Sequence, residues 1–187
     1  LEKQILMSET YQRTSVANST NRNDTRNFSR QTIRPLLAEV AIDTINKAFL
    51  TQDDFGITAP KNSLAIEIGS NEIRGTAGRA LEVFGRGKRE SLCDCDRRTE
   101  NDLRQYTFLV NDPMIHKKIA TTPLQKWLNE DDEKLVSKLY LQFLSRSPKP
   151  SEKQIALKHL RSSKSRKTAL EDLLWVLVNS REFLTNH

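Results

Sequence analysis

The two cysteines of the chain, Cys93 and Cys95, lie one residue apart in the stretch 84–98, which reads FGRGKRESLCDCDRR. A C-x-C pair can offer two soft thiolate ligands to zinc, iron or copper. It can also form a strained disulfide in an oxidising compartment, or remain as two free thiols. The flanking cations favour the thiolate form, whereas Asp94 and Asp96 oppose it. This pair is the first candidate for chemistry, and the three interpretations stay open.

A closed zinc site needs four ligands, so the cysteine pair alone is incomplete. Two of the three histidines, His116 and His187, could complete a Cys₂His₂ set with Cys93 and Cys95. These four residues are therefore the predicted ligands of zinc or iron, and they would have to converge from a loop, a short helix and the end of the chain. For His116 the alternative is a histidine bonded to backbone, behind a helix cap at Asn111 or Asp112. Covalent c-type haem requires C-x-x-C-H, which the sequence lacks, so no covalent haem is expected in this chain.

Five cations surround the cysteine pair and form a candidate anion-binding loop: Arg86, Lys88, Arg89, Arg97 and Arg98. Gly85 and Gly87 interrupt any helix here, so this stretch is expected to be a loop. The alternative is an ordinary solvated surface, because 30 basic residues are spread among 24 acidic ones for a net charge of +6. We do not expect a nucleic-acid partner.

Hydrolase signatures are absent from the sequence: there is no G-x-S-x-G, H-E-x-x-H or P-loop motif. Glu90 and Asp94 could pair as the carboxylates of a glycosidase do. Acidic residues beside an arginine-rich loop are more typical of salt bridges, so no catalytic residue is predicted.

The elements that would position these residues are mainly helical. Residues 1–10 are typical of the end of an amphipathic helix, and residues 11–33 have no apolar period, which predicts a long polar loop. Within that loop, several residues could form a polar network or an anion site, or could only cap turns and face water: Arg22, Asp24, Arg26, Asn27 and Arg30. Helical spacing predicts a helix over about 35–51, opened by Pro35. Ser63–Ile68 alternates apolar and polar residues, which indicates a short strand, and residues 77–84 favour a short helix.

Beyond residue 100 the apolar period of 3.6 recurs almost to the end of the chain. It predicts helices over 101–110 and 114–120, then from 123, from 131, from 150 and from 166. Trp175 is expected at the edge of the last apolar face, and Phe183 and Leu184 are expected to fold back on that helix. The predicted fold class is mainly α, an irregular multi-helix domain with long ordered polar loops and at most one short β element. We expect a single domain over 1–187, with parts 1–34, 35–99 and 100–187.

The first residues, LEKQILMSETY, do not have the basic and apolar regions of a signal peptide. No apolar run is long enough to span a bilayer, so no transmembrane segment is expected. Because residues 1–10 resemble the end of a helix, we expect the chain to be the C-terminal part of a longer family domain.

The motifs of the chain resemble the planctomycete-type C-terminal domain of unknown function found in large proteins with planctomycete cytochrome-c-like domains. The resemblance rests on MSETYQRTS, NRNDTRNFSR, RPLLAEVAID, VFGRGKRESLCDCDRR, NDPMIHKKIA, LYLQFLSRSPKPSE and ALEDLLWVLVNSREFLTNH, in order over nearly the whole chain. Residues 52–83 match only loosely, and Thr185 stands where family members commonly carry an aromatic residue. His116 and His187 fall within matching motifs.

The resemblance implies an exported, periplasmic or cell-envelope location. It also implies partners among the other domains of the same longer protein, with a cytochrome-like domain or an anionic polysaccharide as further candidates. The function expected first is a non-catalytic interaction or assembly module, which should expose an apolar patch. The alternatives are a metal- or disulfide-dependent enzyme domain centred on Cys93 and Cys95, and polyanion binding through the basic loop.

Overall fold

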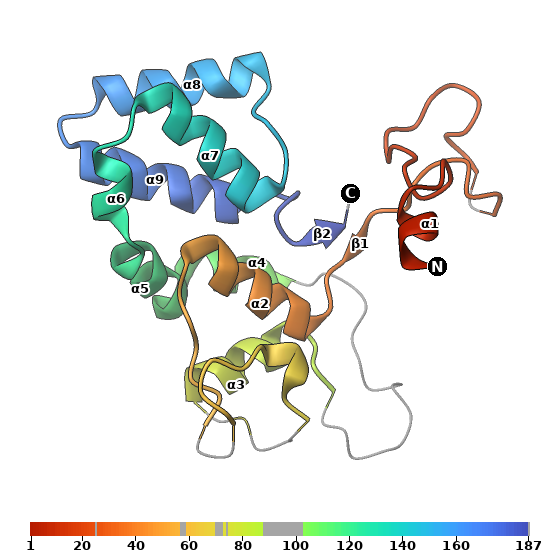
Figure 1. Ribbon diagram of the computed structural model, residues 1–187, viewed down its shortest axis with the longest axis horizontal. Coiled ribbons are helices and arrows are strands. Elements are labelled where there is room, and N and C mark those ends of the chain that lie inside the picture. Colours follow the sequence, from red (N-terminus) through yellow and green to blue (C-terminus); the bar gives the residue numbers. More distant parts are fainter. Residues whose placement is uncertain (25, 57–58, 70–72, 74, 88–102, 187) are drawn as a thin grey trace.

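The fold is mainly helical. The computed structural model describes residues 1–187 except 25, 57–58, 70–72, 74, 88–102 and 187 (Figure 1). In chain order the elements are α1 (Glu2–Leu6), β1 (Arg34–Pro35), α2 (Ala38–Phe49), η1 (Ala65–Glu67), α3 (Gly75–Val83), α4 (Leu103–Asn111), α5 (Pro113–Thr121), α6 (Leu124–Leu128), α7 (Asp132–Leu144), α8 (Pro150–Ser162), α9 (Arg166–Val178) and β2 (Thr185–Asn186). The predicted mainly α class with at most a short β element is confirmed. No helix in the described part of the chain has the length and apolarity needed to cross a bilayer.

The C-terminal helices α7, α8 and α9 pack on one another (Figure 1). Their apolar residues recur at helical spacing, so one face of each helix is buried. Polar caps fix where two of them begin. The side chain of Asp131 accepts from Glu133 N and Lys134 N at 3.1 and 3.2 Å, and Ser165 caps α9 by accepting from Thr168 N.

The second group of helices, α2 to α5, joins the first through a shared core. On α2, Ile42, Ile45 and Phe49 are fully buried. The ring of Phe49 meets that of Phe143 on α7 edge to face, with the centroids 5.2 Å apart. One continuous hydrophobic cluster therefore runs from α2 to the tail after α9.

The tail after α9 folds back, as the sequence predicts. Phe183 is buried, and its ring lies 5.7 Å from that of Phe143. Leu36 N donates to Leu184 O at 3.0 Å, and β2 pairs antiparallel with β1. Trp175 is half-buried and donates from Nε1 to Val110 O, which agrees with a place at the edge of the apolar face.

Two local predictions are wrong. Ser63–Ile68 contains the 3₁₀ turn η1 rather than a strand, because Asp43 accepts from Ala65 N and Ile66 N at 2.7 and 3.1 Å and so stabilises a turn. The alternation was misleading, since Leu64 and Ile66 both face solvent. Pro35 does not open a helix either: it lies in β1, and α2 begins at Ala38.

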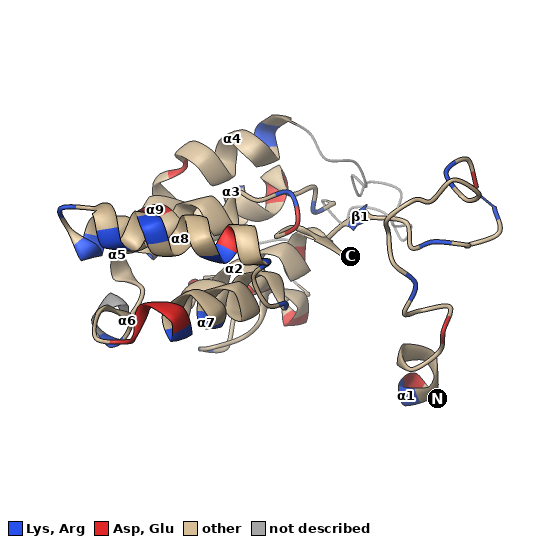
Figure 2. Ribbon diagram, turned by 90° about the horizontal axis from the view of Figure 1, so that it is seen from above, with Lys and Arg blue, Asp and Glu red and all other residues tan. Residues whose placement is uncertain are grey.

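Residues 1–34 form a projection that we call the arm, and residues 35–186 form the body. Figures 1 and 2 show the arm extending away from the helices of the body. No described residue before Ala38 is buried. The arm is joined to the body at β1, where Arg34 pairs with Asn186.

Candidate functional site

Most of the predicted site residues lie outside the described residues. These are Cys93, Cys95 and His187 of the metal set, and Lys88, Arg89, Arg97 and Arg98 of the anion-binding loop. The C-x-C pair, the zinc or iron site and the basic loop therefore stay predictions. His116 and Arg86 are described.

Arg86 lies seven residues before Cys93, and its side chain faces inward. Its Nε is 3.5 Å from Oε1 of Glu39, and its Nη2 donates to Ile68 O at 2.7 Å. The side chain of Arg86 is 8% exposed and that of Glu39 is 0% exposed. Because a buried guanidinium is costly without a partner, this pair fixes the end of α3 against α2. The structure gives Arg86 a structural role.

His116 lies on the exposed side of α5, one turn into the helix. The cap that the sequence predicts in front of it is Asp112, whose side chain accepts from Met114 N at 2.9 Å. Arg79 also pairs with Asp112 at 2.6 Å. Among the described residues no group of three or more His, Cys, Asp or Glu side chains could hold a metal ion.

A buried lysine is one feature that the sequence analysis missed. Lys118 on α5 donates to Asn46 Oδ1 at 2.5 Å, Thr51 Oγ1 at 3.1 Å and Asp53 Oδ1 at 2.7 Å. Burial lowers the pKa of Lys118, against the opposing effect of Asp53. The three acceptors satisfy the ammonium group, so the cluster locks α5 to the end of α2. The available signal was a lysine between Ile115 and Ile119 on an apolar helix face.

An apolar groove of 580 Å³ lies between α8 and α9. It is lined by Tyr140, Glu152, Ile155, Ala156, His159, Asp172, Leu173, Trp175 and Val176. Its polar groups pair within the protein: His159 Nε2 lies 3.0 Å from Asp172 Oδ2, and Glu152 accepts from Arg146. The groove offers an apolar floor with exposed Ile155 and Val176.

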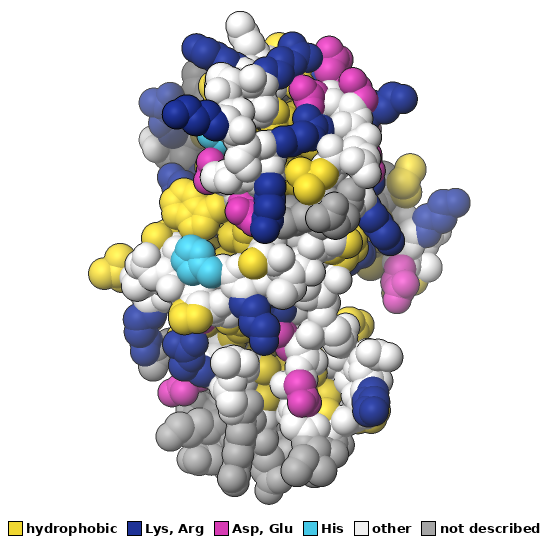
Figure 3. Space-filling model, turned by 90° about the vertical axis from the view of Figure 1, so that its left-hand side faces the viewer, with side chains coloured by type: hydrophobic (Ala, Val, Ile, Leu, Met, Phe, Trp, Pro, Cys, Tyr) yellow, Lys and Arg dark blue, Asp and Glu magenta, His cyan; other side chains and the backbone are white. Residues whose placement is uncertain are grey.

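The side of the body farthest from the arm carries charges of both signs. Figure 3 shows Lys and Arg side chains scattered there among acidic and hydrophobic ones, without a single basic patch. The KSRK cluster at 164–167 is partly structural, because Arg166 donates to Leu128 O and Glu130 O and pairs with Asp132.

The arm holds its conformation through local hydrogen bonds. The carboxylate of Asp24 accepts from the backbone N–H groups of Arg26, Asn27 and Ser29 at 2.9–3.2 Å, and from Ser29 Oγ. The bond from Ser29 Oγ, with these backbone bonds, holds the pKa of Asp24 well below its usual range. Asp24 therefore caps the turn, one of the alternatives left open by the sequence.

Two hydrogen bonds join parts of the arm that are distant in the sequence. Arg13 Nη1 donates to Phe28 O at 2.6 Å, and Gln31 N donates to Thr14 O at 3.1 Å. Yet large hydrophobic side chains along the arm face solvent: Leu1, Ile5, Leu6, Met7, Tyr11, Val16, Phe28 and Ile33. An ordered segment that exposes so many apolar groups is typical of a contact surface, so the arm is the main candidate site.

The comparisons with known proteins identify a family and no close relative. The model of PSD1, a protein of unknown function (DUF1553), matches residues 1–160. No curated protein and no solved structure matches the chain. Because the match covers most of the chain, the protein belongs to the PSD1 (DUF1553) family, the planctomycete-type domain that its sequence motifs resemble.

Proposed function

We propose that the chain is a non-catalytic interaction and assembly module that makes its contact through the arm. It would act in an exported protein of the cell envelope, alongside cytochrome-c-like or polysaccharide-handling domains. The observation that carries the proposal is that the arm is ordered by its own hydrogen bonds while none of its described residues is buried.

Order in an unpacked segment has an entropic cost of about 1–2 kcal/mol for each residue that is fixed. A segment already held in one conformation loses less entropy when a partner binds, and this raises the affinity. The exposed apolar side chains supply surface that a partner would remove from water. The fixed conformation and the exposed apolar side chains both support a preformed contact surface rather than a flexible linker.

The partner expected first is another domain of the same longer protein. The apolar residues Ile5 and Met7 near the start of the arm would pack on it, and β1 would hold the root of the arm against the body. The body would contribute by positioning the arm, and several of its charged groups already pair with one another.

Site-specific photo-crosslinking in the bacterial host tests this proposal. A photoreactive amino acid replaces Val16 in the arm, which is 72% exposed, or Ile155 in the groove, which is 70% exposed. The two positions are matched in exposure and differ in location. A defined adduct from position 16, mapped by mass spectrometry to one protein surface or ligand, is the expected result.

An adduct from position 155 with none from position 16 would overturn the proposal, because the contact would then be made by the α8–α9 groove. Absence of a defined adduct from both positions would also overturn it.

A further inference from the structure

Positive charge is concentrated in the arm. Residues 10–34 contain five arginines and one aspartate, a net charge of +4, whereas the whole chain has +6. The arginines are Arg13, Arg22, Arg26, Arg30 and Arg34, and we call them the arm arginines. Figure 2 shows these cations spread along the arm with few acidic segments near them. Charge counted by segment would have revealed this from the sequence.

The one acidic residue of this stretch does not pair with the guanidinium groups. Asp24 is occupied by three backbone N–H groups and a hydroxyl of its own turn. Its bond with Arg26 involves the backbone nitrogen. Among the described residues, the guanidinium groups of Arg22, Arg26 and Arg34 make no hydrogen bond, whereas Arg13 donates to Phe28 O. The turn therefore fixes the backbone while most of the arm arginines stay available.

Part of the positive charge in the body is paired. Arg86, Lys118 and Arg146 each pair with a carboxylate. Among the described residues, no ion pair involves an arm arginine, and all except Arg30 are exposed. The Nε of Arg30 is buried without a hydrogen-bond partner among these residues. Because a buried N–H without a partner is costly, this atom is a donor that a ligand oxygen could satisfy.

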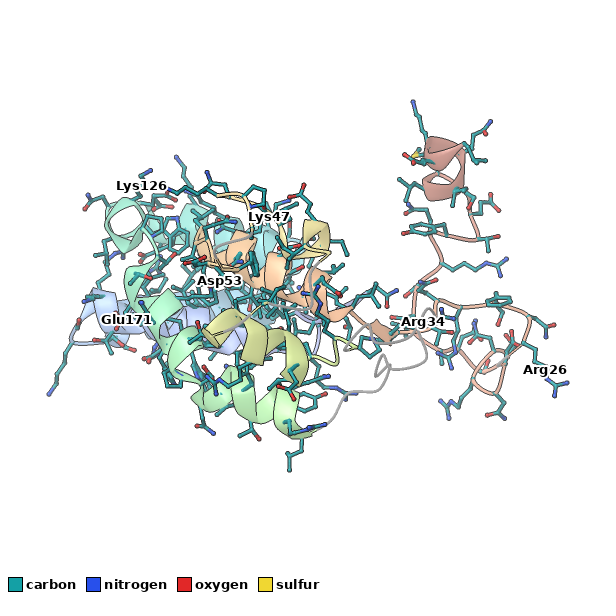
Figure 4. The ribbon with its side chains drawn as sticks, turned by 90° about the horizontal axis from the view of Figure 1, so that it is seen from below. Arg26, Arg34, Lys47, Asp53, Lys126 and Glu171 are labelled. Atoms are coloured by element: carbon teal, nitrogen blue, oxygen red, sulfur yellow. The ribbon has the colours of Figure 1, made fainter. Side chains whose placement is uncertain are left out.

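The arm arginines are spread over residues 13–34 of the sequence. Figure 4 shows Arg34 at the root of the arm and Arg26 at its outer end, pointing away from the body. Tyr11 and Phe28 also expose aromatic rings on the arm. Several cations spread over one segment that also exposes aromatic rings fit a linear polymer with repeated negative groups better than a small anion.

We infer that the arm binds an anionic polysaccharide, whose carboxylate or sulfate groups pair with the arm arginines. This inference rests on the proposed function, since it names a second partner, besides the neighbouring domain, for the same arm. The planar fork of arginine matches the two oxygens of a carboxylate, and sulfate offers a similar oxygen geometry. Single-stranded nucleic acid is the other linear polyanion. Its binding sites stack successive bases on aromatic side chains, whereas residues 1–34 contain only two aromatic residues, Tyr11 and Phe28.

The test measures binding of the intact chain to heparin and to polygalacturonate over a range of salt concentrations, with poly(U) RNA as the competing polymer. The arm variant is R22Q/R26Q/R30Q, and the control variant is K126Q/K134Q/K158Q. The control removes the same charge from exposed body lysines, which make no ion pair with any described residue. Neither variant removes an atom used in the turn of Asp24, so circular dichroism should be unchanged.

The expected result is that at least one polysaccharide binds and that the arm variant loses affinity about tenfold or more, with the control close to wild type. The slope of log K against log salt should fall by about one for each arginine whose contact is lost. Equal losses in both variants would overturn the inference, because net charge alone would then explain binding. Tighter binding to poly(U), or no polysaccharide binding at low salt, would also overturn it.

The two proposals fail separately. A protein adduct from position 16 without polysaccharide binding would contradict the inference of polysaccharide binding and would still support the interaction module. Absence of a defined adduct from position 16 in the host would contradict the module itself, whatever the chain binds in solution.

Discussion

Two phenylalanines show how differently the body and the arm are held. Phe49 on α2 is 0% exposed and meets Phe143 edge to face, whereas Phe28 in the arm is 67% exposed. Two arginines show a similar contrast: Arg146 in the body is held by Glu152 and Glu182, while Arg26 in the arm has no carboxylate partner among the described residues. The body is stabilised by burial and pairing, and the arm by a few local hydrogen bonds.

This difference indicates that the body provides stability and that the arm provides the contact groups. The body can be stable without contributions from the arm, because its core begins at Ala38. The arm can then present apolar and positive groups that would be costly in a core.

The largest expected effect comes from the phenylalanine pair. F49A should lower the free energy of unfolding by about 3–5 kcal/mol, because it leaves a cavity in the core. F28A should change it by less than about 0.5 kcal/mol, as surface substitutions usually do. Urea denaturation followed by circular dichroism measures both. A comparable loss in F28A would show that the arm is part of the folding unit.

Removal of the buried ammonium group should have the next largest effect. K118M should destabilise the body by about 3 kcal/mol, because it leaves the nearly buried carboxylate of Asp53 without its cation. The double variant K118M/D53N should recover part of this loss in the same denaturation experiment. If the single variant is as stable as wild type, the ion pair does not contribute to the junction of α2 and α5.

A pH dependence is expected where α8 meets the tail. Arg146 lowers the pKa of Glu152 from 4.5 to about 2. A lowered carboxylate pKa means that the stabilisation is present above pH 4.5 and is lost as the pH falls toward 2. E152Q should therefore lose about 1 kcal/mol near neutral pH and should show a shallower decline of the melting temperature between these pH values. An identical pH profile in the variant would contradict this assignment.

The smallest effect on global stability is expected in the arm. D24A removes the acceptor of the N–H groups of Arg26, Asn27 and Ser29, so their hydrogen exchange should become faster. The denaturation midpoint should stay within error. D24N, which keeps one acceptor oxygen, should give an intermediate exchange rate. Unchanged exchange in D24A would mean that other contacts order the turn.

Much of the helical part of the fold could be predicted, because apolar periodicity reports local burial. The helices α2, α7, α8 and α9 lie close to their predicted positions, and α7, predicted from residue 131, begins at Asp132. The predicted strand failed for the same reason: Leu64 and Ile66 alternate correctly but face water. Periodicity cannot show which side of a short segment meets the core.

Pairs of residues distant in sequence could not be predicted from one chain. Glu39 with Arg86, and Asp53 with Lys118, meet only after the helices have packed. The zinc or iron hypothesis depends on Cys93 and Cys95 and stays a prediction. The charge of the arm was available from the sequence, but the fact that Asp24 binds its own turn required the structure.

The most direct test of the account is the stability of a chain that lacks residues 1–31, compared with the full chain by urea denaturation. The shortened chain keeps β1 and the whole core. We predict that its free energy of unfolding stays within about 0.5 kcal/mol of the full chain, because no described residue of the arm is buried. A loss of about 2 kcal/mol or more, of the size that buried groups produce, would show that the arm is part of the fold rather than a contact surface.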